Sequence, residues 1–347
     1  MAQLLAFSAG CATAKRALDA TWGVGVYGCV VCVNHHSRKL SAFTLLMTAV
    51  TVPAAAPGFS TNSAPIATDA GGPTEQNWNW HVQNIEIVQG YPEFPARYSG
   101  PNSLPNGGET RETVSLDLMA GVRLWPGAEA HIDGMMWQGF GIGNSLGVDG
   151  FPNGEAFRLG SAVPNENIPR LFIRQAIGFG GEQEVVADDP LTLAGRQDVS
   201  RLTLTLGKMS AKDIFDNNAY ANDPRTQFMN WGLMANEAWD YPADALGYIT
   251  GFAAELNQPS WALRCSFFQV PRSSNGTALD SHFLEAWGMV TELERRYALG
   301  GHPGAIRFLA YLNRAHMGSY QSAVDNFNRG GSIDITTTRA YRSKVGF

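Results

Sequence analysis

The clearest pattern in the chain is an unbroken alternation of apolar and polar residues over positions 113–124. The apolar side carries Val114, Leu116, Leu118, Ala120, Val122 and Leu124. The opposite side carries the polar or small residues, including Ser115, Asp117, Gly121 and Arg123. After Trp125-Pro126-Gly127 the alternation resumes over 128–136, with Ala128 on the apolar side and Glu129 and Asp133 on the charged side. Because successive strand side chains point to opposite faces, the pattern predicts a hairpin with one apolar and one charged face.

Charged side chains in the middle of a strand require water on that side of the sheet. A transmembrane β-barrel meets this requirement with lipid outside and a wet lumen inside. A soluble barrel or sandwich has the same two-faced strands with the apolar face turned inward. The alternation therefore predicts an all-β antiparallel fold and leaves the direction of the apolar face open.

Strand-like segments continue along the rest of the chain, which brings the expected total to nine or ten strands. Besides the hairpin, they cover residues 78–88, 170–179, 201–206, 246–257, 261–270, 283–297, 305–314 and 338–347. Residues 139–169 are rich in Gly, Asn and Pro, which predicts a long loop. Residues 208–244 also break the alternation, and their segment 228–234 is compatible with one or two helical turns.

Composition excludes several classes of protein. Hydrophobic residues make up 44% of the 347 positions, charged residues only 16%, and there are 38 glycines. The one continuous apolar run, residues 40–52, is too short to cross a bilayer as a helix, so the chain is not a bundle of membrane helices. The net charge of −6 provides no basic surface for nucleic acid.

The beginning of the chain has the organisation of an export signal. A polar stretch with Arg38-Lys39 precedes the apolar run, and Ala54-Ala55-Ala56 follows it. We therefore expect a leader with a signal peptide over residues 1–56, a flexible lead-in over 57–77 and a partial barrel over 78–347. The signal lies far from Met1, so either the leader is long or translation starts near Val33.

Cleavage after Ala56 predicts that amino-terminal sequencing of the exported protein begins at Pro57. The competing interpretation is a metal site, because Cys29 and Cys32 have the spacing of metal ligands and two histidines follow them. A mature product that retains both cysteines would contradict the leader and support the metal site.

Several longer motifs resemble one family. They include Trp78-Asn79-Trp80 and its continuation to 84, and the segments 98–104, 108–113, 124–127, 147–154, 212–216, 222–225, 257–259 and 304–318. These segments are similar to the carbohydrate-selective porin (OprB) family. The resemblance implies a transmembrane barrel of about sixteen strands that passes sugars, with apolar side chains toward lipid and charged ones toward the lumen. Since only nine or ten strands are expected, the chain resembles a fragment without its closing strands.

The resemblance also implies a place and a function. We expect a bacterial outer-membrane protein, exported through the periplasm, that allows passive diffusion of monosaccharides such as glucose. Its partners would be the sugar and outer-membrane lipid, without nucleic acid, and it would be a monomer or a homotrimer. The alternative is a secreted, soluble β-rich protein that binds or hydrolyses carbohydrate, which would not require detergent for solubility.

A sugar channel needs charged and amide groups around a narrowing, together with aromatic ring planes. We expect the insertion 208–244 to fold inward and provide that narrowing. Residues expected to line the pore or contact sugar are Arg123, Glu129, Asp133, Arg170, Arg174, Arg201, Asp213, Asp216, Arg225 and Trp231. Any single charge is better explained as a solvated wall residue than as a sugar contact, and the charges define the pore as a set. Trp231 either stacks on a sugar ring or anchors the loop.

The sequence provides no basis for catalysis, a metal or a cofactor in the predicted mature chain. Glu292 and Glu294 are two residues apart on one predicted strand. Glycoside hydrolysis needs carboxylates on both sides of the scissile bond, which one strand face does not supply. We therefore expect a protein that is not an enzyme.

Overall fold

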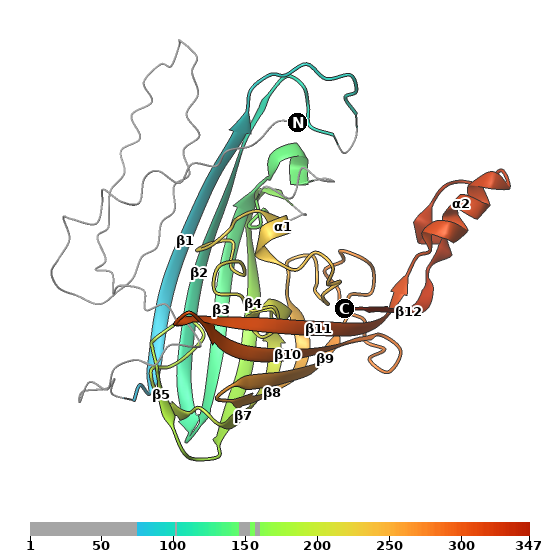
Figure 1. Cartoon of the computed structure of the whole chain (residues 1–347). Coiled ribbons are helices and arrows are strands. Elements are labelled where there is room, and N and C mark those ends of the chain that lie inside the picture. Colours follow the sequence, from blue (N-terminus) through green and yellow to red (C-terminus); the bar gives the residue numbers. More distant parts are fainter. Residues whose placement is uncertain (1–74, 101–102, 146–152, 157–159) are drawn as a thin grey trace, which may run out of the picture.

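The computed structural model describes residues 75–100, 103–145, 153–156 and 160–347 (Figure 1). The predicted leader, its cleavage site and nearly all of the lead-in lie outside these residues. In the part of the chain that the structure describes, no helix has the length and apolarity needed to cross a membrane.

Ten antiparallel strands form one sheet in which almost every strand pairs with its neighbours along the chain. They are β1 (Trp78–Tyr91), β2 (Glu109–Trp125), β3 (Ala128–Gly139), β4 (Ser161–Gly178), β7 (Arg201–Met209), β8 (Ile249–Gln258), β9 (Trp261–Gln269), β10 (Trp287–Leu299), β11 (His302–Met317) and β12 (Ala340–Gly346). The sheet curves around a concave side but does not close, since β1 and β12 are its two edges (Figure 1).

The remaining elements are short. Strands β5 (Gln183–Val186) and β6 (Gly195–Asp198) pair only with each other. The helices are α1 (Trp231–Met234) and α2 (Tyr320–Asn328), with 3-10 turns η2 (Ile142–Ser145), η4 (Ala211–Asp213) and η5 (Ile335–Thr338). Helix α1 confirms the helical turn expected within 228–234, and the Asn230 side chain caps it by accepting a hydrogen bond from the Gly232 amide.

Burial shows which face of the sheet points inward. On β2, Asp117 is fully buried, whereas Leu118 is 58% exposed. Apolar side chains also face outward on β4 and β7, as Leu171 and Leu206 show. A soluble barrel would bury its apolar face. The polar face is therefore the concave one, as the resemblance implied.

Connections differ in length between the two ends of the sheet. Tight turns join β2 to β3, β8 to β9 and β10 to β11, and glycines in left-handed backbone conformation form two of them: Gly127 (φ 76°) and the pair Gly300-Gly301 (φ 57° and 82°). Long segments, such as residues 210–248 and 318–339, connect strands at the opposite end. Outer-membrane barrels have this arrangement, with short turns on the periplasmic side and long loops outside.

The expected loop over 139–169 is wrong over its last nine residues, because β4 begins at Ser161. The register of β4 against β3 shifts at two places, between Asp133 and Met135 and between Trp137 and Gly139. Pro169 and Pro164 lie opposite these shifts, where a strand tolerates a residue without an amide hydrogen. The two prolines interrupt the alternation of apolar and polar residues, so the first part of β4 was not predicted from the sequence.

A similar register shift occurs at the β2–β3 turn. Ala128, which was expected on the apolar face, is buried there.

Candidate functional site

A cavity of about 2020 Å³ occupies the concave side of the sheet. Side chains from the strands and from several loops line it. Pockets for a single small ligand usually measure about 300–1,000 Å³. The volume therefore suits a passage for solutes better than a closed binding pocket.

Residues 210–248, which connect β7 to β8 and are called the β7–β8 loop below, lie within this concave side. On the side of β1 and β2, Arg225 forms an ion pair with Asp117 at 3.0 Å and donates to the Gln83 side chain at 3.0 Å. Arg225 also pairs with Glu155, from the β3–β4 connection, at 2.9 Å. Burial raises the pKa of Glu155 above its usual value, and the neighbouring Arg225 guanidinium offsets this only in part. The Arg225 guanidinium thus links the loop to β1, β2 and the β3–β4 connection.

The opposite wall holds the β7–β8 loop through its backbone. The Asp216 amide donates to Glu292 on β10 at 2.8 Å. Tyr311 and Asn313 on β11 donate to loop carbonyl oxygens at 3.3 and 2.5 Å. Because β2 and β11 are far apart in strand order, the loop bridges the concave side from one wall to the other.

Arg170 on β4 provides a further anchor. Its guanidinium makes a bidentate contact with Asp213, with both N···O distances 2.8 Å, and reaches Asp133 on β3 at 3.1 Å. Burial raises the pKa of Asp213, but the Arg170 guanidinium and the Ser210 amide outweigh this effect and hold it below its usual value. Asp213 is therefore a carboxylate over the neutral pH range, which keeps this anchor charged.

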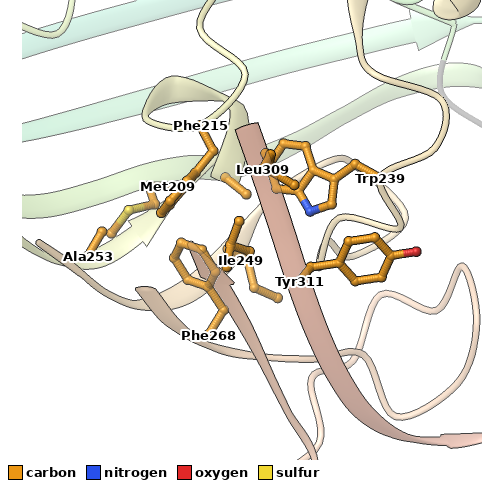
Figure 2. Close-up of a cluster of buried hydrophobic side chains, with 10 residues drawn as sticks. Met209, Phe215, Trp239, Ile249, Ala253, Phe268, Leu309 and Tyr311 are labelled. Carbon is orange, nitrogen blue, oxygen red and sulfur yellow. The ribbon is translucent and has the colours of Figure 1, made fainter. Parts of the chain in front are cut away.

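A hydrophobic cluster lies beneath the same loop (Figure 2). Phe215 is fully buried and contacts Trp239 and Phe268 edge-to-face, with ring centroids 6.2 Å apart in both pairs. The strand residues of the cluster are Met209, Ile249, Ala253, Phe268, Val290, Leu309 and Tyr311. Burial of these apolar side chains, together with the ion pairs, fixes the path of the loop inside the concave side.

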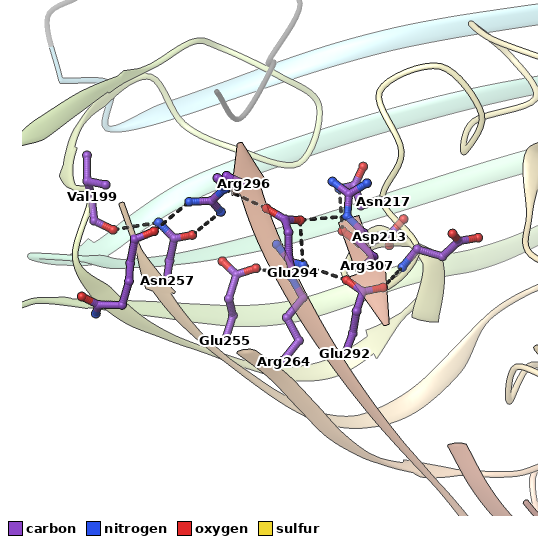
Figure 3. Close-up of polar contacts among 12 residues, drawn as sticks. Val199, Asp213, Asn217, Glu255, Asn257, Arg264, Glu292, Glu294, Arg296 and Arg307 are labelled. Atoms are coloured by element: carbon purple, nitrogen blue, oxygen red, sulfur yellow. Dashed lines mark hydrogen bonds and ion pairs between the residues drawn. The ribbon is translucent and has the colours of Figure 1, made fainter. Parts of the chain in front are cut away.

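A charge network covers the inner face of β8 to β11 (Figure 3). Arg264 pairs with Glu255, with Glu292 at 2.7 Å and with Glu294 at 3.1 Å. Glu294 also accepts from Arg296 and Arg307, both at 2.8 Å. Glu292 and Glu294 are candidates from the sequence only as a catalytic pair, whereas the structure places them in this network. Their alternation with Leu293 and Thr291 was the signal that they belong to the polar wall.

Eight of the ten predicted site residues line the cavity: Arg123, Glu129, Arg170, Arg174, Arg201, Asp213, Arg225 and Trp231. Asp133 lies beneath Arg170 with no exposed surface, and the Asp216 carboxylate accepts from the Asn236 amide at 2.7 Å. Neither is among the residues that line the cavity. Arg174 pairs with Glu129 and Arg201 with Glu184, at 2.9 and 2.7 Å.

The sheet, together with the loop inside its concave side, defines a class of protein. An antiparallel sheet with an apolar outer face, a polar concave face and an inward-folded loop is the architecture of an outer-membrane β-barrel channel. A family model described as "Carbohydrate-selective porin, OprB family" matches residues 101–347, which is most of the chain. The chain belongs to this family. The family is described as one of porins, and membership implies a location in the outer membrane.

A solved structure has the same fold. The high-pH structure of Pseudomonas putida OprB superposes with a TM-score of 0.51 at 14% sequence identity, over 78% of this chain and 59% of that one. This chain thus spans less than two thirds of the length of that protein. No curated protein matches the chain.

The orientation of the faces predicts which positions water can reach. On β7, Leu206 faces outward with 62% of its surface exposed, while Thr203 lines the cavity. In a background without other cysteines, a charged maleimide should label Thr203→Cys in membranes and spare Leu206→Cys, because lipid covers the outer face. The reverse labelling pattern would place water on the apolar face and contradict the orientation.

Proposed function

We propose that the protein is an outer-membrane channel through which monosaccharides such as glucose diffuse passively, and that the β7–β8 loop sets the narrowest part of the path. The observation that carries the proposal is the crossing of the cavity by this loop, from Arg225 at β1 and β2 to Asn313 at β11. A rigid loop across a wide barrel reduces its free cross-section. It also places polar groups in the path of a solute.

The groups at this crossing suit neutral, hydroxyl-rich solutes. Arg170, Arg225 and Asp213 are held in ion pairs, so each presents fixed donors or acceptors without a large unbalanced charge. Sugar hydroxyls both donate and accept, and they replace water at such groups one contact at a time. Trp231 lines the cavity, and we propose that its ring stacks on the apolar side of a sugar. Binding of this kind is weak, which allows the solute to leave.

Solubility separates this proposal from a secreted carbohydrate-binding or hydrolytic β protein. The outward-facing side chains include Leu118, Leu171, Leu206, Ile306 and Phe308, each at least half exposed. A contiguous apolar surface of this kind needs lipid or detergent. We therefore propose export through the periplasm and insertion into the outer membrane. A protein that remains soluble and monodisperse without detergent would favour the alternative.

Liposome swelling tests the proposed activity. The protein, purified in detergent from outer membranes and reconstituted, should let glucose enter and swell the vesicles faster than a disaccharide of the same osmolarity. A fixed narrowing slows the larger solute more. Empty liposomes are the control. Equal rates for both sugars would contradict selection by the loop, and no swelling would contradict the channel.

A further inference from the structure

The connection from β4 to β7 departs from the pattern of the other turns at its end of the sheet. Residues 179–200 join these strands where the neighbouring connections are tight turns. They contain the β5–β6 ribbon, which pairs with no strand of the main sheet. The connection does not extend away from the barrel, because residues 186–197 contribute much of the cavity lining. We call residues 183–198 the inner ribbon.

Strand β1 holds the tip of the inner ribbon. The side-chain amide nitrogen of Asn79 lies 2.8 Å from an Asp188 carboxylate oxygen, and 3.1 and 3.2 Å from the carbonyl oxygens of Asp189 and Thr192. His81 reaches the same Asp188 oxygen at 3.3 Å. Asn79 is 6% exposed, so these contacts lie inside the concave side.

The other walls hold the rest of the inner ribbon. Arg174 on β4 donates to the Leu191 carbonyl at 2.9 Å, and Glu129 on β3 accepts from the Leu193 amide at 3.2 Å. Arg201 on β7 pairs with Glu184 at 2.7 Å. The ribbon is thus fixed to strands on both of its sides, and its own residues Leu193 and Ala194 are buried.

Two charged side chains of the inner ribbon face the cavity. Arg196 and Asp189 are exposed and line it. Among the described residues, the Arg196 guanidinium has no hydrogen bond or ion pair, unlike Arg174 and Arg201 nearby. A connection that served only to join two strands would not need an unpaired guanidinium inside a channel.

We propose that the inner ribbon is a second constriction, in series with the β7–β8 loop, at the short-turn mouth of the channel, where Arg196 and Asp189 contact passing sugars. This inference rests on the proposed function. Short turns of outer-membrane barrels face the periplasm, so the ribbon lies at the exit of the uptake path. The resistances of two narrowings in series add. Opening one of them therefore leaves the other in control of flux.

Modification of a single cysteine in an open channel tests the proposal. The protein is purified from outer membranes with Arg196→Cys in a background without other cysteines, and its single-channel current is recorded before and after a bulky anionic thiol reagent. We expect the current to fall by about half or more, because the added group fills a narrow passage. The reagent should act faster from the short-turn side. Glu182→Cys is the matched control, since Glu182 is exposed on the same connection and does not line the cavity.

The outcomes separate this inference from the proposed function. If the unmodified protein forms no channel, the proposed function fails. If it conducts and modification of Arg196→Cys changes the current no more than modification of Glu182→Cys, the second constriction is wrong while the channel remains. Because each channel is its own reference before modification, a variant with altered folding does not imitate the expected loss. Arg196→Gln should in addition change sugar block of the current, and an unchanged block would remove Arg196 from the path of the sugar.

Discussion

Shortening the β7–β8 loop is expected to raise single-channel conductance by about threefold or more and to weaken sugar block, because the loop is the main obstruction across the channel. Replacing residues 217–235 by a short Gly-Ser linker removes α1 and Arg225 and keeps Asp213, Phe215 and Trp239. The retained residues hold the two ends of the loop to β4 and to the hydrophobic cluster. The measurement is single-channel recording in planar bilayers, with and without glucose.

A matched control is available at the same end of the barrel. Helix α2 lies in another long connection, and it projects away from the concave side (Figure 1). Replacing Tyr320–Asn328 by the same linker should leave conductance and sugar block unchanged. If both replacements have equal effects, the β7–β8 loop is not the principal constriction.

Removing Arg264 is expected to have the largest effect on stability. Its side chain is almost fully buried, and it compensates Glu255, Glu292 and Glu294. Arg264→Met leaves these carboxylates without their shared cation, and breaking a buried pair in this way costs about 3–5 kcal/mol. Urea unfolding in detergent, followed by tryptophan fluorescence, measures the change in the free energy of unfolding.

Arg295→Met is the control for that experiment. Arg295 follows Glu294 on β10 but lies on the opposite, exposed face of the strand. Among the described residues its guanidinium donates only to the Ser260 backbone and hydroxyl. Its loss should cost no more than about 1 kcal/mol. Similar losses for the two variants would mean that the inner charge network contributes little to stability.

Strand positions and the direction of the faces were largely predictable from the sequence. Alternation at Asp117 and Leu118 identified both faces of β2, and the family resemblance decided which of them is outside. The first half of β4 was missed because Pro164 and Pro169 interrupt the pattern at register shifts that depend on pairing with β3. The inner ribbon was missed because its strands pair only with each other, and its folding inward depends on Asn79 and Arg174, which are distant in sequence.

The sequence indicated which strand positions carry polar side chains at the cavity, whereas their part in sugar passage stays a prediction. Polar positions of the strands, such as Arg170 and Arg174, do line the cavity. The sequence did not show which acid each arginine contacts, because the partners come from loops such as the one containing Asp213. Nor did it show that Asp133 is covered by Arg170, since the burial of a wall charge depends on what folds over it.

Sugar block of single-channel current tests the central claim most directly. With the protein from outer membranes in a planar bilayer, added glucose should lower the ion current in a concentration-dependent and saturable manner. A glucose molecule held briefly beside the β7–β8 loop displaces ions from the narrowest part of the path. A current that glucose changes only as much as it changes the conductivity of the bulk solution would contradict a sugar-binding constriction.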